Sequence, residues 1–269
     1  MRGASRASYA ELRDRLDAAA GGNVAAERIG DELFAVTRLL DSEHGLRRAL
    51  ADTSKPSQEK AAVTRRLLHG KVSTETEDLV AEAAAARWAS PGDLADAIEQ
   101  LAIEADTLAA QLGGTLDDLE DDLFRFSRLV SGQPGLRSAL VGPAPTSAKG
   151  NLVNTLLEGK VSATSLSLIT QVLTHPRGRS PQAALDLCAD IAARRREQLI
   201  AVVRVATELS AEQRRRLART LTEAYGRGIH LNVVHDPAVI GGVSVQIGDE
   251  LIDGTAASRL AGVRRRLAG

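Results

Sequence analysis

The feature that most constrains the fold of this 269-residue chain is an internal repeat of helical sequence. Residues 31–50 match residues 121–140 at ten of twenty positions, with an offset of 90. Downstream, the run LLHGKVS at 67–73 returns as LLEGKVS at 156–162, which requires a gap of only one residue. Because both runs recur in the same order and nearly the same spacing, they indicate duplication of a whole structural unit rather than a short solenoid repeat.

The first copy carries the sequence signals of several short helices. Apolar residues at helical spacing between residues 33 and 40 predict one helix. Pro56 and Gly70 bracket a second helix, because proline suits the first turn and glycine the position after the last turn. Thr74 and Glu77 have the spacing of a capping box, which predicts that a third helix begins there.

A fourth helix is predicted to begin at Ser90 and to end at the glycine pair 113–114. The pattern then recurs, and no strand-like alternation precedes residue 199. The first two-thirds of the chain is therefore predicted to be all-α. We assign residues 1–114 to an N-terminal helix plus the first helical repeat, and residues 115–197 to the second repeat.

Residues 198–269 have a different pattern. The run LIAVVRV at 199–205 is rich in β-branched residues and predicts a strand. Ser210 and Gln213 have capping-box spacing ahead of a helix that extends to Tyr225. Apolar residues then alternate again over 229–233. The sequence therefore predicts an α+β protein, in which a duplicated, predominantly helical region precedes a small C-terminal α/β module.

The most specific motif of the chain lies between residues 236 and 260. It begins with an Asp-Pro turn, and a glycine pair then leads into the alternating strand VSVQI. A Gly-Asp turn and a return strand complete a hairpin, and a threonine is placed to cap a final helix. The motif residues are Asp236, Pro237, Gly241, Gly242, Gly248, Asp253, Gly254 and Thr255.

This pattern resembles the C-terminal signature of the delta subunits of F-type ATP synthases, the family that includes the mitochondrial oligomycin-sensitivity-conferring protein. Thr255 stands where serine is usual in the family, which keeps a capping hydroxyl. The resemblance covers the α/β module and the second helical copy, whereas family members usually carry a single N-terminal bundle. The enlarged helical region, rich in Arg and Ala, is similar to the form found in actinobacteria.

The resemblance implies a structural stator subunit with no catalytic residue, cofactor or metal. In this family the helical domain caps the catalytic head of alpha and beta subunits and grips amphipathic N-terminal helices of alpha. The C-terminal module engages the peripheral-stalk b subunit, so that the joint resists the torque of the rotor while ATP is made. The implied location is the cytoplasmic face of the plasma membrane, reached only through the complex.

Phe34 and Phe124 are our candidates for partner binding. They occupy equivalent positions in the two copies, and an apolar groove between bundle helices would suit a bound helix. Their repeated placement is equally consistent with two positions in the interior core. We therefore expect either that both line a groove or that both are buried.

Composition argues against several other functions. The formal net charge of −1 gives no basic excess for nucleic acid, and 2% aromatic residues leave few side chains for base stacking. The single cysteine, Cys188, lies on an apolar helical face, which predicts a buried thiol in a reducing compartment. No run of 18 apolar residues occurs, so we expect a soluble chain that reaches a membrane only through partners.

Arginine triplets at 194–196, 214–216 and 264–266 support the main alternative, an Arg-rich nucleic-acid-associated regulator. Three consecutive arginines span about 300° of a helix and cannot form one stripe, which favours a solvated or partner-facing surface. The glycine-rich runs lack a phosphate-loop pattern, and His230 and His235 are not spaced to converge on one metal. A hydrolase is the weakest alternative, because no nucleophile–base pair is visible.

Overall fold

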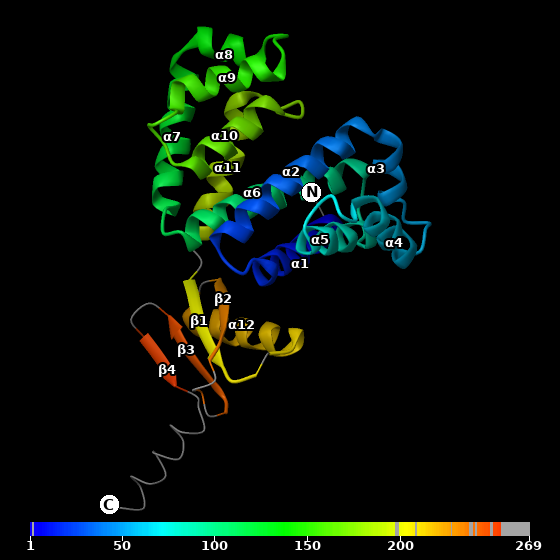
Figure 1. The fold of residues 1–269 in the computed structure, drawn as a ribbon, viewed down its shortest axis with the longest axis vertical. Helices are drawn as coiled ribbons and strands as arrows, with labels where there is room; N and C mark the ends of the chain where they lie inside the picture. Colours follow the sequence, from blue (N-terminus) through cyan, green and yellow to red (C-terminus); the bar gives the residue numbers. More distant parts are fainter. Residues whose placement is uncertain are drawn as a thin grey trace, which may run out of the picture. The chain divides into compact units, whose positions relative to one another are not determined.

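The computed structural model describes residues 1, 3–196, 199–207, 209–226, 228–236, 239, 241–247 and 250–253. The chain divides into two compact units, Met1–Arg195 and Arg196–Gly269. The first holds helices α1 to α11, and the second holds a four-stranded sheet with helix α12 (Figure 1). Both helical repeats therefore lie in one compact unit, and the sequence boundary at residues 114–115 falls inside it.

The duplication is visible in the order of the helices. After a first helix, five helices follow one another, and five more then repeat the order. Helices α3, α4 and α5 contain 8, 12 and 12 residues, as do α8, α9 and α10. The helices are α1 (Ala4–Ala19), α2 (Asn23–Ser42), α3 (His44–Ala51), α4 (Ser57–Leu68), α5 (Thr74–Ala85), α6 (Pro91–Leu112), α7 (Leu116–Gly132), α8 (Pro134–Val141), α9 (Thr146–Leu157), α10 (Ala163–Thr174) and α11 (Pro181–Arg196).

The two copies begin equivalent helices with the same local chemistry. Ser73 and Ser162 are the N-caps of α5 and α10, and each hydroxyl accepts a hydrogen bond from the backbone amide three residues later. Gly70 and Gly159, which precede these caps, have φ angles of 69° and 72°. This left-handed region favours glycine, so the shared GKVS run is a helix-to-helix turn in both copies.

The expected capping pair of Thr74 and Glu77 is wrong by one residue. Thr74 is already the first residue of α5, and Ser73 lies before it in an extended conformation. The Ser73 hydroxyl can reach the Thr76 amide because the cap residue itself must be non-helical. Two adjacent hydroxyl residues give the same sequence signal, and only the backbone conformation distinguishes them.

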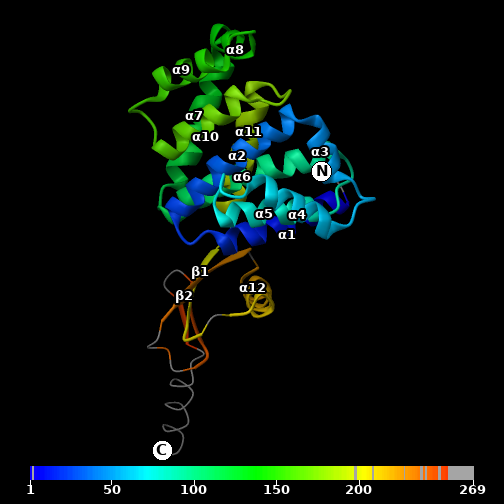
Figure 2. The same ribbon diagram turned by 45° about the vertical axis from the view of Figure 1, so that its right-hand side comes forward.

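Helix α6 is central to the first unit and packs against helices of both copies. All residues from 101 to 110 are buried, whereas α1 exposes much of one side. Figures 1 and 2 show α2 and α6 side by side, between the second copy and helices α1, α4 and α5. One cluster of buried apolar side chains extends from Leu12 in α1 to Ala192 in α11. The two copies therefore share one core.

The close packing of α2 on α6 depends on a glycine. Gly30 in α2 is buried, and a Cβ atom placed there would lie 2.2 Å from Oδ1 of Asp106 in α6. The same Cβ would lie 3.4 Å from the carbonyl oxygen of Ala102. Only a residue without a side chain lets the two helices approach this closely.

We expect Gly30→Ala to lower the free energy of unfolding by about 1–3 kcal/mol, because the buried Asp106 carboxyl group must move to admit the methyl group. Urea unfolding followed by circular dichroism measures the change. Gly45→Ala is the matched control, since Gly45 in α3 has no heavy atom near its Cβ position. That control should be neutral or slightly stabilising. An equal effect of the two substitutions would contradict the close contact.

The second unit is a mixed sheet covered by a helix. Its strands are β1 (Leu199–Val205), β2 (Ile229–His235), β3 (Val243–Ile247) and β4 (Glu250–Asp253), in the order β2-β1-β3-β4. Strand β1 is parallel to β2 and antiparallel to β3, and β3 is antiparallel to β4. Helix α12 (Ala211–Tyr225) connects β1 to β2 and packs Leu221 against Val203 and its buried neighbours.

The α+β prediction is confirmed, and so are the elements that were predicted within the described residues of this unit. The expected capping box is present, since Ser210 and Gln213 exchange hydrogen bonds at the start of α12. The predicted hairpin is formed by β3 and β4. The final helix predicted after Thr255 lies outside the described residues.

Candidate interaction surfaces

The described signature residues lie around the strands of the second unit. The backbone amide of Asp236 donates a 2.9 Å hydrogen bond to the carbonyl oxygen of Val205, which ties the end of β2 to β1. Gly241 and Gly242 have φ angles of 66° and 81° immediately before β3, so this turn requires glycine. Asp253 ends β4. These four residues shape the backbone.

The other signature residues, Pro237, Gly248, Gly254 and Thr255, lie outside the described residues. Strand β4, which the motif encodes, is at one edge of the sheet. Its Leu251 and Ile252 are 60% and 39% exposed. Because successive side chains of a strand point to opposite faces of the sheet, each face of β4 carries one of these exposed aliphatic side chains.

The two candidate phenylalanines differ sharply in burial. Phe34 in α2 is 5% exposed and belongs to the core of the first unit, whereas Phe124 in α7 is 64% exposed. The expectation of equivalent environments is therefore wrong. Phe34 presents no surface to a partner in this structure, and Phe124 does.

Side-chain hydrogen bonds join α2 to the second copy. Thr164 Oγ1 of α10 donates a 2.6 Å hydrogen bond to Glu27 Oε1 of α2, and Arg38 Nη1 of α2 donates a 2.8 Å bond to Gln171 Oε1 of α10. Phe34 is seven residues after Glu27 and four before Arg38, so all three lie on one helix face. That face meets the second copy.

Helix α7 has residues of the same types at the equivalent positions, but there they are exposed. With the offset of 90, Glu27, Phe34 and Arg38 correspond to Asp117, Phe124 and Arg128, which are all exposed. An acid, a phenylalanine and an arginine thus recur at the same spacing on both helices. Within the described residues this face of α7 stays exposed, which makes it a candidate docking surface.

Buried ion pairs hold α11 and the loop before it against the first copy. Arg195 Nη2 lies 2.8 Å from Glu104 Oε2 and 3.0 Å from Asp17 Oδ1. Five residues earlier in α6, the Glu99 carboxylate binds both Arg177 and Arg179, with contacts of 2.7 and 2.5 Å. These pairs join side chains from both copies, which ties the two copies into one helical unit.

The same contacts explain one of the arginine triplets. Arg195 is 1% exposed, whereas Arg194 and Arg196 are exposed. In the second triplet, Arg214 Nε donates to the carbonyl oxygen of Leu209, and the third triplet lies outside the described residues. Neither described triplet presents three cations to one surface, so the nucleic-acid-associated alternative is not favoured.

Two titratable groups of the helical unit, Cys188 and Tyr9, are held in their neutral forms. Cys188 is a free, fully buried thiol, as predicted, and burial raises its pKa far above the usual range. A protonated thiol that solvent cannot reach is a poor nucleophile. Burial, together with the nearby Glu104 carboxylate, likewise raises the pKa of Tyr9 far above its usual range. Both side chains therefore stay neutral, and the Tyr9 hydroxyl donates a 3.1 Å hydrogen bond to Glu104 Oε1.

The described residues also lack two features of other protein classes. No group of three or more His, Cys, Asp or Glu side chains in this part of the chain could hold a metal ion. No helix in the same part is long and apolar enough to cross a membrane. The described chain consists of a helical unit and a small sheet module, each with exposed apolar side chains at defined places.

Comparison with known proteins identifies the family. The family model described as "ATP synthase delta (OSCP) subunit" matches residues 95–267. The chain is 48% identical over 271 residues to the ATP synthase subunit delta of Streptomyces griseus, and 46% identical over 271 residues to that of Thermobifida fusca. Each alignment covers 100% of both proteins. The chain belongs to the ATP synthase delta (OSCP) subunit family, whose members are components of the ATP synthase stator.

The comparison also clarifies the duplication. The match to the family begins at residue 95, inside α6, so the family unit starts with the helix that the two copies share. The family model does not match residues 1–94, whereas the full-length relatives align with the whole chain, including these residues. The resemblance noted from the C-terminal motif is thereby confirmed. The extra helical copy is part of the form that these actinobacterial relatives have.

Proposed function

We propose that this subunit joins the catalytic head of the ATP synthase to its peripheral stalk. The helical unit binds amphipathic N-terminal helices of the alpha subunits, beside the beta subunits, and the α/β module binds the b subunit. The joint resists rotor torque and carries no catalytic residue, cofactor or metal. The subunit is peripheral at the cytoplasmic face of the plasma membrane and is attached there only through the complex.

Two observations together support this proposal. The chain belongs to the delta subunit family, and its helical unit has an exposed aromatic side chain. Phe124 is 64% exposed on α7 and is flanked by Asp117 and Arg128 on the same face. An aromatic anchor with charged residues around it is the usual centre of a helix-binding interface. The exposed Leu251 and Ile252 on β4 support a second, separate contact for the stalk.

A pull-down from membranes tests the proposal as a whole. The tagged full-length chain should bring down alpha, beta and b subunits together. The complete absence of all three from the eluate would contradict the stator assignment. Recovery of alpha and beta without b would contradict only the proposed role of the α/β module.

The role of Phe124 is tested by Phe124→Glu. We expect this variant to weaken binding of a peptide from the alpha-subunit N-terminus by about tenfold or more, because truncating a central aromatic anchor commonly costs that much. Fluorescence anisotropy with a labelled peptide measures the affinity. Val24→Glu is the matched control, since Val24 is 73% exposed on α2 and receives the same substitution.

Unchanged affinity of the Phe124→Glu variant, with its helical content intact by circular dichroism, would remove Phe124 from the interface. Equal weakening in the Val24→Glu control would show a general charge effect and would remove it as well. In either case the pull-down still decides whether the subunit belongs to the stator.

A further inference from the structure

The connection between α10 and α11 contains a strained turn. In this turn, residues 176–179, the Arg179 amide donates a 2.9 Å hydrogen bond to the carbonyl oxygen of Pro176. The two central residues, Arg177 and Gly178, have φ angles of 50° and 78°. Among the described residues, Arg177 is the only one other than glycine with a positive φ. Positive φ at both central positions is typical of a type I′ turn, where Asn and Gly are usual, so an arginine there is strained.

Ion pairs to the first copy hold the 176–179 turn in this shape. Arg177 Nε lies 2.6 Å from Asp41 Oδ2 of α2. Its Nη1 atom lies 2.9 Å from Asp96 and 2.7 Å from Glu99, both in α6. Arg179 Nη1 and Nη2 lie 2.7 and 2.5 Å from the two carboxylate oxygens of Glu99. Two guanidinium groups of one turn therefore bind carboxylates of two helices.

The corresponding connection of the first copy is held differently. It joins α5 to α6 through the five residues 86–90, whereas the six residues 175–180 join α10 to α11. Trp88 in the shorter connection is 4% exposed and donates its indole N–H to the carbonyl oxygen of Ala83. Not one of the residues 175–180 is buried. Polar contacts, rather than apolar burial, therefore hold the second connection in place.

The carboxylates of this contact are specific to the first copy. With the offset of 90, Asp41 and Glu99 correspond to Ser131 and Ala189, which are neutral. The second copy thus lacks these two carboxylates, and it supplies both arginines. The contact therefore depends on differences between the copies rather than on what they share.

We propose that the 176–179 turn is a conformational latch between the two helical copies, which opens locally while both copies stay folded. Opening exposes little apolar surface, because the turn has no buried side chain. Opening also releases strain, since Arg177 can return to negative φ once it leaves the carboxylates. Closed, the latch ties α2 and α6 to the α10–α11 connection, and open, it frees them.

The ion pairs oppose this opening only in part. The side chains of Glu99 and Arg177 are 3% and 11% exposed in the closed turn, so both charges are largely removed from water. Opening hydrates them again, which offsets much of the lost attraction. The open turn is therefore accessible from the folded state.

The consequence for the subunit rests on the proposed stator function. A helical unit that is tied at this point transmits force as one body. With the latch open, the two copies are less tightly coupled, and the unit is more compliant. The latch itself is a property of the isolated chain and can be tested there.

Native-state hydrogen exchange of the full chain in increasing urea, followed by NMR, tests the latch. The Arg179 amide closes the turn and so reports each opening. We expect it to exchange at least about tenfold faster than the buried amides of α6, and with little dependence on urea, because a local opening exposes little surface. Exchange at the rate and with the urea dependence of the α6 amides would show that the turn opens only on unfolding, and would overturn the proposal.

Two substitutions at carboxylates test the role of charge. Glu99→Gln should speed exchange of the Arg179 amide by about tenfold or more, since both arginines of the turn bind this carboxylate. Asp190→Asn, at an exposed carboxylate of α11, is the matched control and should leave the rate unchanged. Circular dichroism checks that both variants are folded. An unchanged rate in Glu99→Gln would overturn the latch.

A comparison of Arg177→Gly with Arg177→Ala tests the strain. Both remove the guanidinium group, but only glycine adopts a φ of 50° without strain. The Arg179 amide should exchange about fivefold more slowly in the glycine variant than in the alanine variant. Faster exchange in the glycine variant would overturn the strained turn. These outcomes are separate from the pull-down: a chain that recovers alpha, beta and b while its Arg179 amide follows the α6 amides is a stator subunit without a latch.

Discussion

Replacing Arg195 by alanine is expected to lower the free energy of unfolding of the helical unit by about 3–5 kcal/mol. Arg195 is 1% exposed, and its guanidinium contacts both Glu104 of α6 and Asp17 of α1. Without it, the Glu104 carboxylate, itself 3% exposed, stays buried with no counter-charge. The loss comes from that uncompensated charge more than from the lost attraction.

The single tryptophan provides the measurement. Trp88 is 4% exposed in the first unit, and its indole N–H donates a 2.7 Å hydrogen bond to the carbonyl oxygen of Ala83. Its fluorescence in urea therefore reports unfolding of the helical unit. Arg194→Ala is the matched control, since Arg194 is the exposed neighbour, and it should change stability by less than about 0.5 kcal/mol.

A double variant tests the cause. Arg195→Met together with Glu104→Met should cost less than the sum of the two single changes, because removing both charges leaves neither unpaired. A loss in Arg195→Ala no larger than in Arg194→Ala would contradict the buried ion pair. Full additivity of the two methionine substitutions would contradict the electrostatic explanation.

Replacing Asp106 by asparagine is expected to remove a pH dependence of stability. Asp106 is 3% exposed, and burial raises its pKa well above the usual range, with the nearby carboxylates of Asp31 and Glu27 adding to the effect. Its Oδ2 atom has no hydrogen-bond partner in the described part of the chain. The folded protein therefore holds this side chain as the neutral acid.

The direction of the effect follows from the raised pKa. Above the ordinary value of 3.8, the unfolded chain releases the proton while the folded chain keeps it. The contribution of Asp106 is thus fully present below that pH, and it falls by about 1.4 kcal/mol per pH unit until the folded-state pKa is reached. Cys188 lies near Asp106 but stays protonated, because its own pKa is raised.

Urea unfolding of the wild type and of Asp106→Asn between pH 4 and pH 8 measures this contribution. The stability difference should move in favour of the asparagine variant as the pH rises. Asp118→Asn, at an exposed carboxylate of α7, is the matched control and should show no such trend. A constant difference between wild type and Asp106→Asn would contradict the raised pKa.

Much of the fold could be predicted from the sequence because its signals are local. Pro56 and Gly70 mark the ends of α4, and the Ser210–Gln213 pair marks the start of α12. Alternation at Val243 and Val245 indicates a strand whatever it packs against. The prediction that Thr74 and Glu77 form the capping pair was wrong, because Ser73 and Thr74 are both hydroxyl residues. Only the backbone conformation shows that Ser73 is the N-cap.

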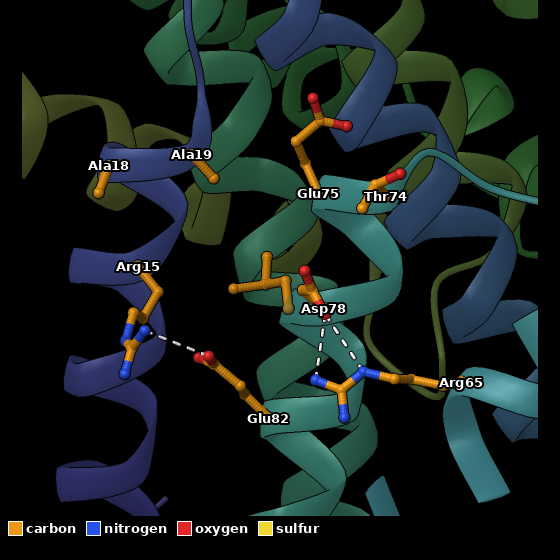
Figure 3. Close-up of a pocket in the computed structure, with 9 residues that line it drawn as sticks. Arg15, Ala18, Ala19, Arg65, Thr74, Glu75, Asp78 and Glu82 are labelled. Atoms are coloured by element: carbon orange, nitrogen blue, oxygen red, sulfur yellow. Dashed lines mark hydrogen bonds and ion pairs between the residues drawn. The ribbon is translucent and has the colours of Figure 1, made fainter. Parts of the chain in front are cut away.

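The candidate surfaces could be predicted only in part. The repeat drew attention to Phe34 and Phe124, but it could not distinguish their environments, since the two have similar sequence contexts and differ in what covers them. The sequence did not distinguish the buried Arg195 from its two exposed neighbours, because all three residues of the triplet are arginines. The hollow lined by Arg15 of α1 and by Glu75 and Glu82 of α5 (Figure 3) has no sequence signal of its own, because it is defined by helices that are far apart in the chain.

The sequence by itself determined which segments are helix and which are strand, that the helical region is duplicated, and to which family the C-terminal motif points. These are properties of neighbouring residues, and the backbone expresses them locally. The tertiary structure alone decided that α6 packs against helices of both copies, that α2 meets the second copy, and that Phe34 is buried while Phe124 is exposed. The physical reason is that a duplicated unit repeats its helix faces, but burial of each face depends on whether another helix is present to cover it.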